Sequence, residues 1–121
     1  MPSTRALGGQ IEQWAAKYLT QRGYLILEHN YHTQFGEIDL IARQNNQIVF
    51  VEVKARSSAR FGQPTEAVTP RKLQKIIKAG QHYLKQHSLS HLPARIDVLA
   101  VWLNTKDKSP QKAVLLTNVT G

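Results

Sequence analysis

The sequence predicts an α/β protein, with a mixed central sheet and helices packed on its faces. Two segments, one near the start of the chain and one over residues 69–87, repeat apolar residues at helical spacing. Residues 36–43 and 47–56 alternate instead, as strands do. Residues 96–103 are nearly all apolar, which is typical of a strand buried on both faces. The 121 residues suffice for one domain with a core of its own, so we expect a single domain over 1–121.

The first half of the chain should form a helix and three strands. The helix covers 7–22, and Gly23 fits the position that ends it. A strand over 24–31 comes next, followed by a hairpin whose tip is Asn45-Asn46, because asparagine tolerates positive φ. Strict alternation in the hairpin would place Ile38, Leu40 and Ala42 on one face of the sheet.

The second half continues with a loop over 57–68 and then a helix. Thr69 can cap this helix and Pro70 suits its first turn. Because the helix is a crossover, the strand over 96–103 should lie parallel to the strand over 47–56. Residues 113–117 form a last strand, so the expected order is α-β-β-β-α-β-β.

The hairpin carries an unusual set of charges. If the glutamines that flank its turn face each other, Asp39 lies opposite Glu52 and Glu37 lies opposite Lys54. The second pair can be an ordinary cross-strand ion pair. The first is a like-charge pair, so either one acid keeps its proton or a cation lies between them. Two carboxylates suit Mg²⁺, and Lys54, on the face of Glu52, could stabilise charge on a phosphoryl group. The hairpin is therefore a candidate metal site for phosphodiester chemistry.

The charge balance favours a polyanionic partner. Sixteen Lys and Arg stand against eight Asp and Glu, for a net charge of +8. Nucleic acid is the first candidate, an acidic membrane surface is the lesser one, and weak non-specific binding is the alternative to both. The helix over 69–87 carries cations along one face, which either contact phosphates or are simply solvated: Arg71, Lys72, Lys75, Lys78 and Lys85.

The absence of cysteine, the lack of long apolar segments and the spacing of the histidines exclude several classes of protein. There is no cysteine, which excludes disulfides and cysteine zinc sites and is compatible with a reducing cytosol. We find no apolar signal core at the N-terminus and no apolar run of the ~20 residues that a membrane span needs, so we expect a cytoplasmic protein without a membrane partner. The five histidines form no HExxH pattern, and we interpret them as surface or packing residues.

The motifs resemble a known family. The D-x12-E-x-K arrangement of Asp39, Glu52 and Lys54 resembles the PD-(D/E)XK nuclease superfamily, whose restriction-endonuclease-like core is α-β-β-β-α-β. "GEIDLIA", "FVEVKAR" and "TPRKLQKI" together look like the YraN family, a bacterial group of uncharacterised function. The hairpin also resembles that of archaeal Holliday junction resolvases. The resemblance covers residues 7–103.

The resemblance implies a metal-dependent endonuclease acting on DNA, with branched or damaged DNA among the candidate substrates. Asp39 and Glu52 would hold Mg²⁺, or Mn²⁺ in its place, with the Val53 carbonyl and Glu12 completing the site. A water at the metal would attack phosphorus, with Lys54 helping to position it. By analogy with the resolvases, the protein would be a homodimer.

The resemblance also makes further residues candidates. Glu12 occupies the place of a first-helix glutamate of the superfamily; Ile11 stands where the family usually has glycine, and the alternative is an ordinary exposed acid. Asp97 is interpreted as structural, paired with Arg95 or a loop. Arg56, Gln63, Glu66 and Lys72 match family positions near the site. With the cations of the helix over 69–87, the candidates for nucleic-acid binding are Arg56, Arg71, Lys72, Lys75 and Lys78.

Two other classes stay open. The chain could bind nucleic acid with a nuclease fold but without physiological cleavage, acting with a partner enzyme. It could also be an interaction module in which the acids only form ion pairs. Fold alone does not decide between these functions.

Overall fold

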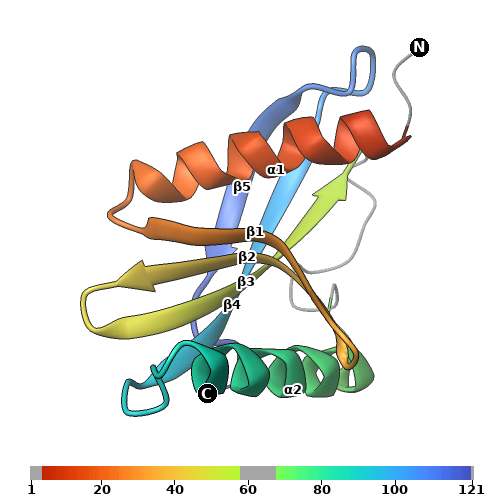
Figure 1. The fold of residues 1–121 in the computed structure, drawn as a ribbon. Helices are drawn as coiled ribbons and strands as arrows, with labels where there is room; N and C mark the ends of the chain where they lie inside the picture. Colours follow the sequence, from red (N-terminus) through yellow and green to blue (C-terminus); the bar gives the residue numbers. More distant parts are fainter. Residues whose placement is uncertain (1–3, 58–67, 121) are drawn as a thin grey trace.

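The predicted element order is confirmed. The structure, a computed structural model, describes the backbone of residues 4–57 and 68–120, with side chains from residue 9 onward. Its elements are α1 (Thr4–Thr20), β1 (Leu25–Thr33), β2 (Gly36–Gln44), β3 (Gln47–Arg56), α2 (Pro70–Gln86), β4 (Ala94–Leu103) and β5 (Pro110–Leu116) (Figure 1). The first helix thus begins and ends earlier than predicted, and the last strand begins earlier.

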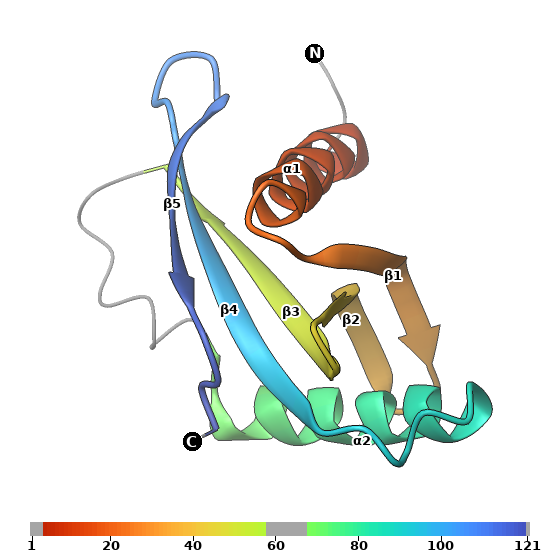
Figure 2. The ribbon, with the colours of Figure 1, turned by 90° about the vertical axis from the view of Figure 1, so that its left-hand side faces the viewer.

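The strands form one mixed sheet in the order β1-β2-β3-β4-β5. Only the central pair, β3 and β4, is parallel, and the other neighbours are antiparallel. The parallel pair follows from the crossover through α2, as predicted. Figure 2 shows the twist of this sheet between its two helices.

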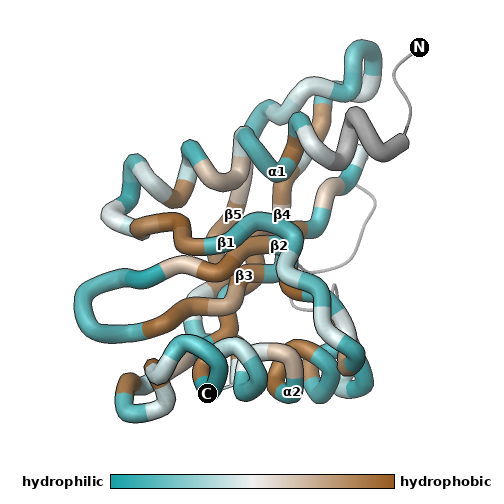
Figure 3. The backbone as a smooth tube through the Cα atoms, viewed as in Figure 1, coloured by the Kyte–Doolittle hydropathy of each residue, from teal (hydrophilic) through white to brown (hydrophobic). Residues whose placement is uncertain are grey.

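The two helices cover opposite faces of the sheet. Ala15 and Leu19 of α1 pack on one face of the central strands, and Ile76, Ala79 and Tyr83 of α2 pack on the other. The central strands β3 and β4 contain long hydrophobic stretches (Figure 3). None of the described helices is both long enough and apolar enough to cross a membrane.

Local sequence signals account for the placement of both helices. Gly23 has a φ of +88°, which fits its role after the end of α1. The Thr69 hydroxyl accepts a hydrogen bond of 3.2 Å from the Lys72 backbone N–H and so caps α2. Gly80 lets α2 approach the sheet closely, because a Cβ there would lie 2.6 Å from the Phe50 ring.

A buried polar cluster around Asp97 connects segments that are far apart in the sequence. Asp97 is fully buried and accepts hydrogen bonds from Arg95 Nε at 3.0 Å, from the Tyr24 hydroxyl at 2.8 Å and from the Asn118 backbone N–H at 2.8 Å. The prediction that Asp97 is structural and paired with Arg95 is confirmed. The cluster joins the residue before β1, strand β4 and the segment after β5.

The hairpin has the predicted register, but the side chains of β2 do not alternate between the two faces of the sheet as predicted. Gln44 pairs with Gln47 around the turn, and the printed ladder between β2 and β3 runs as far as Leu40 and Val51. Before Leu40 the two strands separate: β1 and β2 turn toward α2 while β3 continues away from them (Figure 1). Ile38 therefore packs against α2, on the opposite face from Leu40, and its predicted place beside Leu40 and Ala42 is wrong.

Candidate functional site

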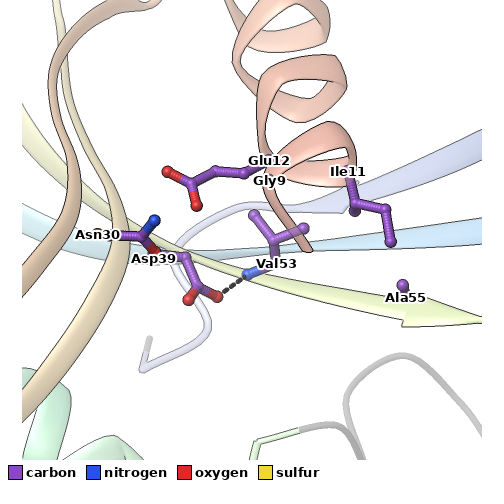
Figure 4. Close-up of a pocket in the computed structure, with 7 residues that line it drawn as sticks. All are labelled: Gly9, Ile11, Glu12, Asn30, Asp39, Val53 and Ala55. Carbon is purple, nitrogen blue, oxygen red and sulfur yellow. Dashed lines mark hydrogen bonds between the residues drawn. The ribbon is translucent and has the colours of Figure 1, made fainter. Parts of the chain in front are cut away.

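The opening between β2 and β3 is where Asp39 lies. Continued antiparallel pairing would next join the Val53 N–H to the carbonyl of Ile38. Instead, this N–H donates to Oδ2 of Asp39 over 2.8 Å (Figure 4). The carboxylate replaces a ladder hydrogen bond, which fixes its orientation and holds it at the mouth of the opening.

Asp39 and Glu52 are brought together as predicted. Glu52 is buried, with 4% of its surface exposed. Burial, a hydrogen bond with Asp39 and the charge of Asp39 together raise the pKa of its carboxyl to about 7, although the charge of nearby Lys72 counteracts them. A hydrogen bond between two carboxyl groups needs a proton on one of them. The pair therefore has the high proton affinity expected of like charges held together without a metal ion.

Glu12 reaches the same place from α1. It is only 8% exposed, and it lines a cavity of about 480 Å³ with Asp39, Val53 and Ile11. Figure 4 shows its carboxylate and that of Asp39 on either side of Asn30. Burial raises the pKa of Glu12, although nearby His29 counteracts this. The alternative of an ordinary exposed acid is wrong, since the helix points Glu12 into the cavity.

Two residues near Glu12 were not predicted as part of the site. His29 is exposed, as the interpretation of the histidines as surface or packing residues implies, and its Nδ1 lies 3.2 Å from Glu12 Oε1. Asn30 lines the cavity and has a left-handed φ of +47°. Their place depends on how β1 pairs with β2, which includes a register shift between Ile26 and Glu28. No spacing in the sequence indicates that shift.

The lysines near Glu52 do not have the partners that were predicted. Lys72 Nζ lies 3.1 Å from Glu52 Oε1, so the partner of Lys72 is a carboxylate of the site. Lys54 lies beside Lys72, and its pKa is lowered by a hydrogen bond with Lys72 and by burial. The predicted Glu37–Lys54 ion pair is wrong: Glu37 Oε2 lies 3.2 Å from His32 Nδ1. The reason is that β2 has already left β3 at Glu37.

Comparison with known proteins places the chain in a family. The sequence model of "Uncharacterised protein family UPF0102" matches residues 11–101. The chain belongs to the UPF0102 family. A UPF0102 protein of Caldanaerobacter subterraneus is 44% identical over 114 residues, covering 94% of this chain and 93% of that protein. One of Syntrophomonas wolfei is 48% identical over 80% of this chain and 84% of its own length. One of Vibrio parahaemolyticus is 43% identical over 87% of this chain and 88% of its own length. The resemblance to the YraN family, which is UPF0102, is thus confirmed.

The UPF0102 chain has a second cavity beside the first turn of α2. Its volume is about 470 Å³, and it is lined by Gly36, Glu37, Thr69, Arg71, Lys72, Lys75 and Ile76. Three of these are cations and one is an acid. Lys78, predicted with them as a nucleic-acid contact, is not among the described lining residues. Arg56 lies at the end of β3, near enough for its charge to lower the pKa of Lys54. Gln63 and Glu66 lie outside the described residues.

The carboxylates near Asp39 are oxygen donors of the kind that Mg²⁺ binds. Among the described residues, no three His, Cys, Asp or Glu side chains converge into a ready-made metal cage. Mg²⁺ does not need one, because it is usually held by one or two carboxylates and keeps waters or substrate phosphates as its other ligands. Glu12 and Asp39 at one cavity, with Glu52 in contact with Asp39, supply oxygen donors of this kind. The residues therefore fit Mg²⁺ held partly by a substrate.

Proposed function

We propose that this UPF0102 protein is a cation-dependent endonuclease that hydrolyses phosphodiester bonds in DNA. The observation that carries the proposal is the pair of half-buried Asp39 and buried Glu52, with Asp39 held at the opening between β2 and β3 by the Val53 N–H. Two carboxylates in contact repel each other, and a divalent cation supplied with a phosphate would relieve this repulsion. The D-x12-E-x-K pattern that carries the resemblance to PD-(D/E)XK nucleases includes both acids.

Each side chain has a role in this account. Asp39, Glu52 and Glu12 are the carboxylates that would hold Mg²⁺ or Mn²⁺, and the Val53 carbonyl stays a predicted fourth donor. The bound ion would polarise the phosphoryl group and lower the pKa of a water molecule. Lys54, beside Glu52 on β3, would position that water or stabilise the added negative charge on the phosphate. Hydrolysis forms a bond from the water oxygen to phosphorus and breaks one to a sugar oxygen, which takes up a proton.

The charge of the protein supports DNA as the polyanion. The net charge is +8 although three of the eight acids lie in the hairpin, so the remaining surface is strongly basic. Such a surface attracts a phosphate backbone irrespective of its sequence. The homodimer expected by analogy with junction resolvases stays a prediction, as does the preference for branched or damaged DNA.

One observation favours a second candidate, a nucleic-acid-binding protein without physiological cleavage. Lys72 neutralises Glu52 directly, so the carboxylate pair has a resident positive partner without any metal. If this pairing persisted in the complex with DNA, Glu52 could not take part in holding a cation. The protein would then bind DNA and leave cleavage to a partner enzyme.

A cleavage assay distinguishes the two functions. Single-stranded, duplex, flap and four-way DNA would be incubated with the protein and Mg²⁺, Mn²⁺ or a chelator, with Asp39→Asn as the matched control. The nuclease predicts cleavage of at least one form that requires the cation and is lost in the variant. Binding of these DNAs without cleavage in either metal would contradict the nuclease and favour the binding protein.

A further inference from the structure

The cavity beside α2 is separate from the one that Glu12 and Asp39 line, and its charge is opposite. Arg71, Lys72 and Lys75 line it, against a single acid, Glu37, which is exposed and already lies 3.2 Å from His32. A cavity of about 470 Å³ with three cations is suited to an anionic group rather than to an apolar ligand.

Two of these cations lie in the first turn of α2, where the helix dipole is unfavourable to positive charge. The first turn of α2 has no acidic residue and contains Arg71 and Lys72. Positive charge at a helix N-terminus is opposed by the helix dipole, which favours acids there. Lys75 lines the same cavity and lies close to Gly36, where an added Cβ would be 3.3 Å from the Lys75 Cβ. An anion in the cavity would offset the repulsion among these charges.

Lys72 connects this cavity to the carboxylate pair. It lines the cavity, and its ammonium Nζ lies 3.1 Å from Glu52 Oε1. Its side chain is partly exposed, with 39% of its surface accessible, whereas Glu52 is buried. Lys72 can therefore be reached by a ligand in the cavity, and a ligand that attracted its ammonium would separate it from Glu52.

We propose that the cavity lined by Arg71, Lys72 and Lys75 binds a backbone phosphate of a nucleic-acid strand, and that Lys72 exchanges Glu52 for this phosphate when the strand binds. The inference rests on the proposed function for the identity of the ligand, since a strand whose reacting phosphate lies at Asp39 and Glu52 brings its neighbouring phosphates with it. The exchange leaves Glu52 available to a cation only when the strand is in place. It also resolves the conflict between the Lys72–Glu52 ion pair and a cation-binding role for Glu52.

The first test compares two lysines of the same helix. Lys75 lines the cavity, whereas Lys78, which is also exposed, is not among its described lining residues. Affinity for a short single-stranded oligothymidylate would be measured without divalent cations at several salt concentrations. Lys75→Gln should weaken binding about tenfold, the effect of losing a hydrogen bond to a charged group. It should also flatten the log–log salt slope by about 0.7. Lys78→Gln should change the affinity and the salt slope much less than Lys75→Gln does. Equal losses in the two variants, or no loss in Lys75→Gln, would overturn the phosphate site.

The second test is a double-mutant cycle for the exchange. Glu52→Gln removes the carboxylate that competes for Lys72, so it should tighten oligothymidylate binding several-fold. In the Lys72→Gln background, the same change should give much less tightening, because no ammonium is released there. The Lys72→Gln background also controls for the simple loss of a nearby negative charge. Equal tightening in both backgrounds, or none in either, would overturn the exchange.

The outcomes of these two tests do not depend on whether the protein is a nuclease. They contain no divalent cation and do not measure cleavage, so a phosphate site can be demonstrated in a protein that never cleaves DNA. Wild-type protein that does not bind the oligonucleotide at all would contradict the inference and nucleic-acid binding together. Wild-type binding with indistinguishable Lys75→Gln and Lys78→Gln variants would contradict the inference alone.

Discussion

The backbone N–H of Val53 donates a hydrogen bond of 2.8 Å to the carboxylate of Asp39, across the point where β2 leaves β3. An asparagine side chain has a carbonyl oxygen that can accept the same bond. The charge of Asp39 can therefore be removed while its structural contact is kept. This makes position 39 suited to separating a functional role from a structural one.

Asp39→Asn should weaken Mg²⁺ binding by about tenfold or more, the loss expected when one charged ligand of a hydrogen-bonded set is neutralised. The fold should be unaffected or slightly more stable without metal, because the repulsion from Glu52 is relieved. Calorimetric titration with Mg²⁺ and thermal melting measure the two effects. Asp107→Asn, which removes an acid from an exposed turn after β4, is the control. Unchanged Mg²⁺ affinity in Asp39→Asn would contradict a cation site at the pair.

The stability of the cation-free protein should depend on Glu52 and on pH. The pKa of Glu52 is about 7 in the folded protein and near 4.5 for an ordinary glutamate. The folded state therefore binds this proton more tightly, and the free energy of unfolding should fall as pH rises from about 4.5 to about 7. A shift of this size corresponds to roughly 3–4 kcal/mol, since one pKa unit is equivalent to about 1.4 kcal/mol.

Glu52→Gln isolates this effect from other titrating groups. The difference in unfolding free energy between the variant and the wild type, measured by denaturant titration without divalent cations, should grow in favour of the variant through this pH range. Saturating Mg²⁺ should reduce the difference, because it would stabilise only the folded wild type. A difference that stays constant with pH would mean that the Glu52 carboxyl titrates normally.

Much of the fold could be predicted from the sequence because it follows from local patterns. The Asn45-Asn46 turn fixed the pairing of Gln44 with Gln47, and the crossover helix required β3 and β4 to be parallel. The separation of β2 from β3 could not be predicted in this way. It results from the packing of Ile38 against α2, a contact between segments far apart in the sequence.

The candidate site shows the same division. Asp39 and Glu52 lie on paired strands, so counting from the turn brought them together. Lys72 lies in a different element, and no pattern in the hairpin indicates that its ammonium reaches Glu52. His29 and Asn30 depend on the register of β1, which contains a shift. The Asp39–Glu52 pair was therefore predictable from the hairpin, Glu12 was predicted only through the family resemblance, and the contacts of Lys72 and His29 were not predicted.

Asp97→Asn should destabilise the fold without weakening Mg²⁺ binding in the protein that remains folded. Asp97 is fully buried and is the charge partner of Arg95. Removing one member of a buried ion pair leaves the other uncompensated, at a cost of about 3–5 kcal/mol. Denaturant unfolding measures the change, with Asp107→Asn again as the control. Stability equal to that of the wild type would mean that this cluster does not hold the sheet together.

Gly80→Ala should also destabilise the protein, because α2 cannot keep its present distance from β3. The added Cβ would lie 2.6 Å from a carbon of the Phe50 ring, which is buried. Overpacking of this kind costs about 1–3 kcal/mol. Adding Phe50→Leu, which removes the ring from the contact, should recover part of the loss. Thermal melting that showed no loss in Gly80→Ala would contradict the close approach of α2.

Single-turnover cleavage by Lys54→Ala tests the central claim, that the hairpin is a centre for phosphodiester hydrolysis. The experiment would use the DNA form that the wild type cleaves, with Mg²⁺ and with Mn²⁺, and Lys17→Ala, which changes an exposed lysine of α1, would be the control. If Lys54 acts on the transition state, the variant should keep most of its DNA affinity while its cleavage rate falls by ~10²-fold or more. Lys17→Ala should cleave at nearly the wild-type rate. Cleavage by Lys54→Ala at the wild-type rate would contradict the account.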